Sequence, residues 1–219
     1  SMEAAFGDLR QAPCILEALV PFQGEMSVVI ARSATGEIRS YEPAENVHKD
    51  GILHTSRVPA SFGKVVQDEA MAAATRLITA LDHVGVLACE FFVLKSGEIR
   101  LNEMAPRVHN SGHWTPEACL TGQFEQHIRA MWDLPLGKTD SKVAGIMVNL
   151  VGAEGHTGNV VYENIEEIMA MGGVTPHIYG KKQTRPFRKM GHVTIVNESI
   201  DEARRVAQKV KETIKVVSK

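Results

Sequence analysis

The sequence has few cysteines, few aromatic residues and no long apolar run. Its three cysteines, Cys14, Cys89 and Cys119, are widely spaced and odd in number, so neither a disulfide framework nor a cysteine-based zinc site is expected. A reducing, cytoplasmic location suits this pattern. No stretch reaches the length of a membrane span, and no basic-then-apolar leader opens the chain. We therefore expect no membrane partner.

An excess of positive charge is also missing. The 24 lysines and arginines are outnumbered by 26 acidic residues, which gives a net charge of -2. General nucleic-acid binding needs a basic imbalance, so nucleic acid is not an expected partner and any basic patch must be local. With 219 residues, 44% of them hydrophobic, the chain can bury a core in one or two domains.

Extended runs, helical periodicity and turn residues predict the order of elements. We expect strands over 14–20, 25–32, from Ile38, 85–94, 99–105, 143–151, 175–179 and 192–196. We expect helices over 68–83, 116–132, 160–171 and 200–216. Asp68 is expected near one N-cap, and Thr115 before Pro116 at another. Linker composition over 134–140 predicts a domain boundary between 1–134 and 135–219.

A hairpin over 85–105 is expected to place two glutamates face to face. If Ser96 and Gly97 form a two-residue turn, Leu94 pairs with Ile99, and Glu90 falls opposite Glu103. Directly opposed like charges destabilise a sheet, so a positive group is needed between them. One glutamate could be protonated or paired with an arginine. A magnesium ion completed by phosphate oxygens would also neutralise the pair, and Asn102 adds a polar group beside it.

Two motifs in this hairpin resemble a known family. The sequences ACEFF, which contains Glu90, and LNEMAPR, which contains Asn102 and Glu103, resemble the magnesium-binding strands of the ATP-grasp superfamily. The longer run NEMAPRVHNSGHWT resembles the signature of its purine-pathway carboxylating branch, the 5-(carboxyamino)imidazole ribonucleotide synthetases. The resemblance implies an α+β fold, in which the C-terminal part of an ATP-grasp domain, an antiparallel sheet with helices, precedes a small α/β domain. It also implies ATP and Mg²⁺ as cofactors.

The resemblance assigns nucleotide contacts to the first fifty residues. Glu17 would lie near the adenine amino group, with the main chain of Ala18, Leu19 and Val20 along the ring edge. Glu25 would hold the ribose hydroxyls, and His48 would make a further nucleotide contact. Taken alone, each of these residues could equally be a surface strand or loop residue. Asn102 and Glu103 complete the nucleotide-side set.

The same resemblance assigns the acceptor substrate to two polar segments. The first contains Arg107, His109, Asn110 and Ser111, although Asn110 and Ser111 could also only build the turn and His113 could pack under Trp114. The second is the basic run GKKQTRPFRKMGH, in which Lys181, Arg188 and Lys189 would bind the ribonucleotide phosphate. Arg107, His109, Lys181 and Arg188 would be the catalytic residues. Such a run is otherwise a solvated surface.

One residue departs from the family pattern in this basic run. Phe187 stands where glycine is common in the resembling proteins. Only glycine adopts positive φ freely, so the substitution could alter the backbone of the loop. The cations keep their register on either side of it.

The implied reaction is an ATP-dependent carboxylation of 5-aminoimidazole ribonucleotide. Bicarbonate would be phosphorylated to carboxyphosphate, and the products would be N-carboxyaminoimidazole ribonucleotide, ADP and phosphate. We find no glycine-rich phosphate-covering loop before residue 14 and no N-terminal α/β domain. The N-terminal half of the enzyme is therefore an expected missing partner, and this chain alone is expected to show little turnover and weak nucleotide binding.

Two other readings stay open at this stage. A related purine-pathway ligase, the formate-dependent transformylase, shares the ATP-grasp features, although HNSGHWT and the basic run speak against it. A noncatalytic association domain is the alternative from another class. A homodimer is expected, with 146–151 and the helix from Ile200 as apolar surface, although core packing would explain both segments equally well.

Overall fold

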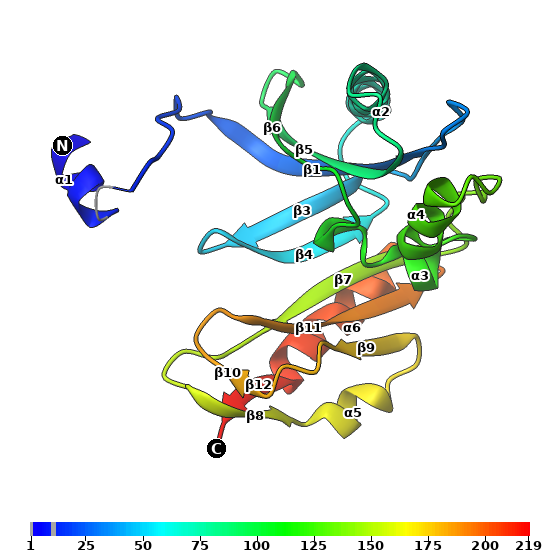
Figure 1. Ribbon diagram of the computed structural model, residues 1–219. Coiled ribbons are helices and arrows are strands. Elements are labelled where there is room, and N and C mark those ends of the chain that lie inside the picture. The colour runs from blue at the N-terminus through cyan, green and yellow to red at the C-terminus, as the bar shows by residue number, and fades with distance from the viewer. Residues whose placement is uncertain (1, 10–11) are drawn as a thin grey trace.

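The computed structural model describes residues 2–9 and 12–219, and it is an α+β structure. Within these residues, nine strands form one antiparallel sheet in the order β6-β5-β1-β3-β4-β7-β11-β9, with β2 paired to β1 alone. A second sheet has the order β10-β8-β12. Figure 1 shows α2 over one end of the large sheet and α6 against the other. The strands are β1 Phe22–Arg32, β2 Ile38–Ser40, β3 Ala44–Lys49, β4 Ile52–Val58, β5 Gly85–Leu94, β6 Ile99–Ala105, β7 Ala144–Val151, β8 Gly158–Glu163, β9 Val174–Ile178, β10 Gln183–Thr184, β11 Lys189–Asn197 and β12 Lys215–Ser218.

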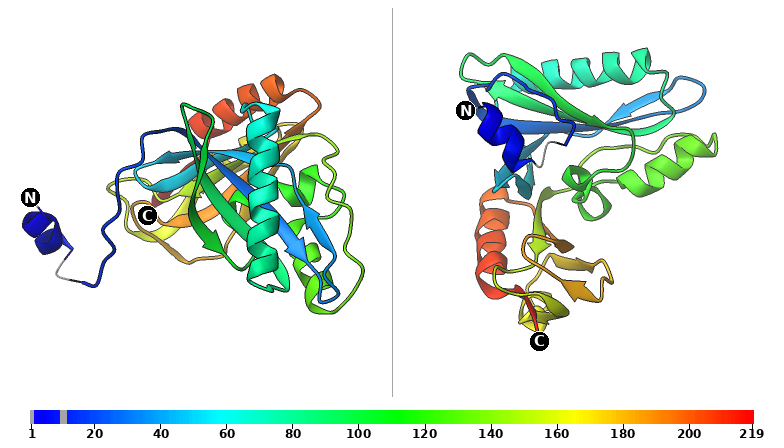
Figure 2. Two further views of the ribbon diagram at one scale, coloured as in Figure 1. Left: turned by 90° about the horizontal axis from the view of Figure 1, so that it is seen from above. Right: turned by 60° about the vertical axis from the view of Figure 1, so that its left-hand side comes forward.

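The helices are short, apart from two that cover the sheet. They are α1 Met2–Asp8, α2 Lys64–Ala80, α3 Thr115–Ala118, α4 Gln123–Met131, α5 Ile165–Met169 and α6 Ile200–Thr213, with a 3₁₀ turn at Asn110–Gly112. The right-hand view of Figure 2 shows α2 along the top of the molecule, with α6 below it on one side and α4 below it on the other.

Three apolar clusters hold these layers together. Met26, Leu87 and Phe91 pack under Ala74 and Ile78 of α2. A second cluster lies on the opposite face of the sheet, around the fully buried ring of Trp114. A third lies between β7, β11 and α6. Because β1 and β5 alternate between the first two clusters, each strand is buried on both faces, and a polar side chain on either one is exceptional.

The predicted strand over 14–20 is wrong. These residues form no ladder, and the side chains of Ile15, Leu16 and Leu19 are 86%, 80% and 96% exposed. β-rich composition alone does not make a strand, because the segment needs a neighbour that accepts its backbone hydrogen bonds. The paired strand begins at Phe22 and includes the predicted 25–32. The predictions also missed β3, β4 and β10.

Four helix predictions need correction at their boundaries. The first helix begins at Lys64 after Gly63, so Asp68 lies inside it and accepts an ion pair from Lys64 instead of capping. The helix expected over 116–132 is broken into α3 and α4. The segment expected as a helix over 160–171 is β8 followed by α5. The last helix ends at Thr213, and Val216 lies in β12.

Thr115 explains the break between α3 and α4. It is the first residue of α3, not its cap. Its hydroxyl accepts a hydrogen bond of 2.9 Å from the backbone N–H of Gln123, the first residue of α4, and donates one of 2.7 Å to the carbonyl of Gly112. Thr115 therefore satisfies an unpaired donor at the start of the next helix.

The segments expected to offer a dimer surface are occupied within the chain. β7 pairs with β4 on one edge and with β11 on the other. Ala203, Ala207 and Val210 of α6 are buried against the sheet. Core packing is thus the role of both segments, and a homodimer remains a prediction. No helix in the described ranges is long and apolar enough to cross a bilayer.

Candidate active site

Glu90 and Glu103 face each other across β5 and β6, as predicted. Nearer the turn the register differs from the prediction, because Val93, not Leu94, pairs with Ile99. An irregularity between Glu90 and Phe91 then shifts the register by one, which leaves Asn102 as the extra residue on β6. Glu90 is only 8% exposed, whereas Glu103 is exposed.

The carboxyl group of Glu90 is held in an unfavourable environment. Burial raises its pKa, and repulsion by Glu103 raises it further. Glu25 also raises the pKa of Glu90, whereas His48 and Lys189 lower it. A cation between Glu90 and Glu103 would relieve both causes. The donor set, two carboxylates that converge from neighbouring strands, fits the oxygen ligands that Mg²⁺ requires.

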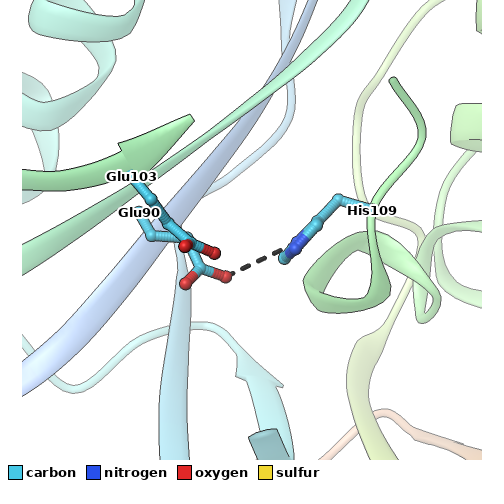
Figure 3. A group of neighbouring side chains, drawn as sticks. All are labelled: Glu90, Glu103 and His109. Atoms are coloured by element: carbon cyan, nitrogen blue, oxygen red, sulfur yellow. Dashed lines mark ion pairs between the residues drawn. The ribbon is translucent and has the colours of Figure 1, made fainter. Parts of the chain in front are cut away.

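His109 approaches this pair from the loop that follows β6 (Figure 3). Its Nδ1 lies 3.5 Å from Oε1 of Glu90 and 2.9 Å from the Ser111 hydroxyl. The backbone N–H of Ser111 also donates to Nδ1, at 3.3 Å. Burial, followed by repulsion from Arg107 and Lys189, lowers the pKa of His109 to about 4. The imidazole is therefore neutral at pH 7, and its Nδ1 carries a lone pair.

Asn110 and Ser111 face into the protein. The amides of Asn110 and Asn149 exchange hydrogen bonds of 2.9 and 2.7 Å, and Asn149 also donates to the carbonyl of Leu53. Ser111 is fully buried. Both residues anchor the loop that carries His109, which was the alternative left open by the sequence. Direct contact between them and a substrate stays a prediction.

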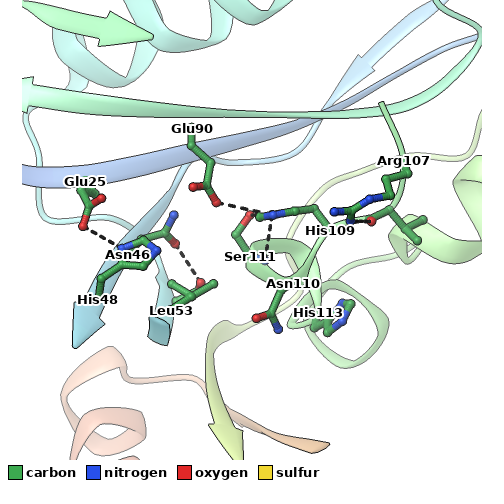
Figure 4. Close-up of polar contacts among 12 residues, drawn as sticks. Glu25, Asn46, His48, Leu53, Glu90, Arg107, His109, Asn110, Ser111 and His113 are labelled. Atoms are coloured by element: carbon green, nitrogen blue, oxygen red, sulfur yellow. Dashed lines mark hydrogen bonds and ion pairs between the residues drawn. The ribbon is translucent and has the colours of Figure 1, made fainter. Parts of the chain in front are cut away.

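The predicted nucleotide residues lie at two places on the same side of the hairpin. Glu17, Ala18, Leu19 and Val20 line a cavity of about 380 Å³ together with Asn102, and its wall includes the stacked rings of Phe22 and Phe92, whose centroids are 4.6 Å apart. Glu25 is bonded to His48, with 2.7 Å between Oε2 and Nδ1, and Figure 4 shows this pair beside Glu90.

The basic loop between β9 and β11 brings cations toward the carboxylates. Lys189 is electrostatically coupled to Glu90, Glu103 and Arg107, and burial lowers its pKa while the two glutamates oppose that shift. Lys181 donates to the carbonyl of Lys189, and Arg188 donates to the carbonyl of Gln183 at 2.8 Å. Lys189 of this loop thus lies near the acidic groups of the hairpin. The hydrogen bond of Arg188 to Gln183 does not place its guanidinium near the carboxylate pair.

Phe187 keeps the backbone conformation that glycine would adopt. Its φ is +63°, in the left-handed region. The loop is held there by a hydrogen bond of 2.9 Å from the Phe187 N–H to the carbonyl of Gly152. A phenylalanine in this left-handed conformation carries backbone strain that glycine would avoid.

Sequence reasoning missed Gln123, a fully buried residue of α4. Its amide oxygen accepts from the backbone N–H of His109 at 3.0 Å, and its amide nitrogen donates to the His109 carbonyl at 2.8 Å and to Nδ1 of His113 at 2.8 Å. One side chain thus fixes the backbone of the loop. The available signal was a glutamine on the buried side of an amphipathic helix.

A stack of three imidazoles lies beneath this loop and was also missed. The His113 and His192 ring centroids are 4.7 Å apart, and those of His192 and His177 are 4.4 Å apart. His177 is bonded to Glu117 at 2.8 Å, and Tyr179 to Nδ1 of His192 at 3.0 Å. Burial lowers the pKa of His113 to about 4 and that of His192 to about 3. His113 comes from a loop, His177 from β9 and His192 from β11, so sequence spacing gave no indication of the stack.

This combination of hairpin, carboxylate pair and facing basic loop defines a class of protein. The family model for the ATP-grasp domain matches residues 2–124, and that for the phosphoribosylaminoimidazole carboxylase C-terminal domain matches residues 145–206. The chain belongs to the ATP-grasp family. The two matches lie on either side of the predicted boundary at 134/135, which itself stays a prediction.

Two curated relatives share the same name. The chain is 50% identical over 190 residues to N5-carboxyaminoimidazole ribonucleotide synthase of Brucella melitensis, covering 87% of this chain and 51% of the relative. It is 45% identical over 201 residues to the Bacillus subtilis synthase of the same name, covering 92% and 51%. The chain therefore spans about half the length of the curated relatives it matches.

Solved structures agree with this relationship. The N5-carboxyaminoimidazole ribonucleotide synthetase of Thermotoga maritima superposes with a TM-score of 0.88 at 44% identity, covering 97% of this chain and 58% of that one. The synthase of Aspergillus clavatus, solved with ADP and 5-aminoimidazole ribonucleotide, gives a TM-score of 0.80 at 30% identity, covering 89% and 52%. The predicted fold class is confirmed by these matches.

Proposed function

We propose that this chain forms the metal-binding and acceptor-binding walls of an ATP-dependent carbon–nitrogen ligase that carboxylates 5-aminoimidazole ribonucleotide. The observation that carries the proposal is the buried Glu90 opposite Glu103, with Lys189 close enough to be electrostatically coupled to both carboxylates. In the proposed reaction, ATP phosphorylates bicarbonate to carboxyphosphate, which carboxylates the exocyclic amine. The products are N-carboxyaminoimidazole ribonucleotide, ADP and phosphate, as in purine biosynthesis.

The nucleotide would lie along the hairpin. Glu17 to Val20 and Asn102 line the cavity beside Phe92, which suits an adenine ring against aromatic and main-chain groups. Glu25, oriented by His48, would accept hydrogen bonds from ribose hydroxyls. Glu90 and Glu103 would hold Mg²⁺, which when bound neutralises the charge on the transferred phosphoryl group.

The acceptor would lie between the hairpin and the basic loop. Lys189 and Arg107 would attract the bicarbonate-derived anion, since Lys189 is coupled to both carboxylates and Arg107 is a second cation near Lys189. His109, neutral at pH 7, would accept a hydrogen bond from the acceptor amine at Nδ1, in place of the 3.3 Å contact from the Ser111 N–H, and so orient the amine. Lys181 and Arg188 would bind the ribonucleotide phosphate, with the planar guanidinium suited to two phosphate oxygens.

Titration calorimetry with the two candidate acceptors tests this assignment. We expect 5-aminoimidazole ribonucleotide to bind in the presence of Mg²⁺ and ADP, and glycinamide ribonucleotide to bind at least tenfold more weakly. Lys181→Ala and Arg188→Ala should each weaken binding about tenfold or more, because each removes a charged phosphate contact.

Lys182→Ala is the matched control, since Lys182 is an exposed lysine of the same loop. It should leave the affinity unchanged. Equal affinity for both ribonucleotides, or equal effects of all three substitutions, would contradict the assigned acceptor.

A further inference from the structure

The carboxylate pair has a third potential metal ligand that magnesium does not need. The candidate ligand atoms of Glu90, Glu103 and His109 all lie within 4.8 Å of one another. They come from β5, from β6 and from the loop after β6, and they point toward a common centre (Figure 3). Mg²⁺ prefers oxygen ligands, whereas imidazole beside carboxylates is a donor set typical of Zn²⁺. Mn²⁺ shares the oxygen ligands of Mg²⁺ but also accepts imidazole.

The spacing of these atoms suits a transition-metal ion. Zinc bonds to imidazole nitrogen and carboxylate oxygen are each about 2.1 Å long, so two ligand atoms 3.5 Å apart subtend an angle of roughly 113° at the ion, close to tetrahedral. The widest separation of 4.8 Å exceeds the span of two such bonds, about 4.2 Å. One carboxylate must therefore turn inward. Glu103 is exposed and has room to do so.

The imidazole is already held in place without an ion. Gln123 fixes the backbone N–H and carbonyl of His109, and Ser111 contacts its Nδ1. Because the Ser111 N–H donates to Nδ1, this nitrogen has a lone pair, which a metal ion can take over in place of that 3.3 Å contact. Such fixed orientation of a ligand favours metal binding.

We propose that Glu90, Glu103 and His109 form a transition-metal site, which binds Zn²⁺ or Mn²⁺ in the absence of nucleotide with His109 as the third protein ligand. From the proposed function, this proposal takes over only the metal-binding role of Glu90 and Glu103. An imidazole bound to Zn²⁺ through Nδ1 is not free to accept a hydrogen bond from an acceptor, so Zn²⁺ at this site competes with the acceptor for His109. Mg²⁺, which stays on oxygen ligands, leaves His109 free.

Pulsed electron paramagnetic resonance of the Mn²⁺-loaded chain, without nucleotide, tests the assignment directly. The wild-type spectrum should contain the ¹⁴N modulation of one coordinated imidazole, a result that needs no variant to fold. The modulation should disappear in His109→Gln and persist in His83→Gln. His83 is the matched control, because it lies just before β5, away from the carboxylate pair, and contacts the carbonyl of Val86.

Calorimetric titration with Zn²⁺ gives the second readout. His109→Gln should weaken Zn²⁺ binding at least tenfold, as expected for the loss of a ligand, and should change Mg²⁺ affinity less than twofold. Glu90→Gln and Glu103→Gln should weaken the binding of both ions.

The outcomes separate this inference from the proposed function. Mn²⁺ binding that depends on Glu90 and Glu103 but shows no ¹⁴N modulation would overturn the role of His109 and leave the carboxylate site standing. Modulation that survives in His109→Gln would also overturn it. Metal affinity that is unchanged in both Glu90→Gln and Glu103→Gln would contradict this proposal and the proposed function together.

Discussion

Glu90 and Glu103 lie opposite each other because two departures from an ideal hairpin cancel. The loop has three residues instead of two, with Leu94 and Glu98 joined by a backbone hydrogen bond of 2.8 Å and Gly97 at a φ of +86°. The bulged Asn102 restores the register four residues further along β5. Without the bulge, Asn102 would stand opposite Glu90, and Glu103 would turn to the other face of the sheet.

The first prediction concerns the stability cost of Glu90. Its folded-state pKa is raised by burial and by Glu103, so ionisation at neutral pH destabilises the metal-free fold. Glu90→Gln should therefore raise the free energy of unfolding by roughly 1 to 3 kcal/mol at pH 7.5, the usual desolvation cost of an unsatisfied buried group. Urea denaturation in the presence of a chelator measures it.

The effect of Glu90→Gln should vanish at acid pH. Below the ordinary glutamate pKa the side chain is protonated in both the folded and the unfolded state, so the two proteins become equally stable near pH 4. Glu98→Gln, at an exposed glutamate paired with Arg100, should change stability by less than about 0.5 kcal/mol. A Glu90→Gln protein that is less stable at pH 7.5 would rule out this explanation.

The second prediction concerns acid sensitivity. The pKa of His113 is lowered to about 4 and that of His192 to about 3, so protons bind the unfolded state first. Each histidine contributes stability that is present above pH 6.5 and is lost as pH falls, at about 1.4 kcal/mol per pH unit.

Substitution of His192 isolates this contribution. His192→Phe should reduce the slope of unfolding free energy between pH 6 and pH 4.5 by about 1.4 kcal/mol per unit. Tyr179→Phe removes the same hydrogen bond but no titrating ring, so its slope should match the wild type. Identical slopes for all three proteins would show that the stack does not control acid stability.

The third prediction separates two buried glutamines on one helix. Gln123 fixes the His109 loop, whereas Gln126 makes equivalent bonds of 2.8 Å to the carbonyl and N–H of Gly137. Replacing either with leucine should cost roughly 3 kcal/mol, because backbone partners are left unsatisfied. Only Gln123→Leu should shift the ¹⁵N resonances of the His109 imidazole, and equal shifts in both variants would contradict the assigned role of Gln123.

The fourth prediction concerns the left-handed Phe187. A non-glycine residue at a φ of +63° carries a strain of about 1 kcal/mol that glycine avoids. Phe187→Gly should therefore be about 1 kcal/mol more stable than Phe187→Ala, a comparison that removes the aromatic ring from both proteins. Thermal unfolding measures the difference, and a more stable alanine variant would show that the loop relaxes to another conformation.

Local patterns predicted the parts of the fold where neighbours in sequence are neighbours in space. The hairpin over 85–105 was predicted with its observed bounds, because strand propensity and turn chemistry agreed there. The segment 14–20 has equal strand propensity, but it has no pairing partner. The helix expected over 116–132 is broken between Ala118 and Gln123, where the Thr115 hydroxyl accepts from the first backbone N–H of α4, and periodicity alone carries no information about that bond.

The candidate site was predicted unevenly for the same reason. Glu90, Glu103 and His109 lie within twenty residues of each other in the sequence, so one hairpin and its loop bring them together. Gln123 and the imidazole stack depend on contacts between distant segments, such as His113 with His192. These contacts follow from tertiary packing, and no spacing in the sequence indicates them.

The most direct test is a crystal structure of this chain with Mn²⁺ and ADP, in which anomalous scattering locates the ion. The account predicts an anomalous peak within bonding distance of carboxylate oxygens from both Glu90 and Glu103, next to the ADP phosphates. ADP bound along the hairpin with no ion on these two glutamates, or with the ion held elsewhere, would contradict it.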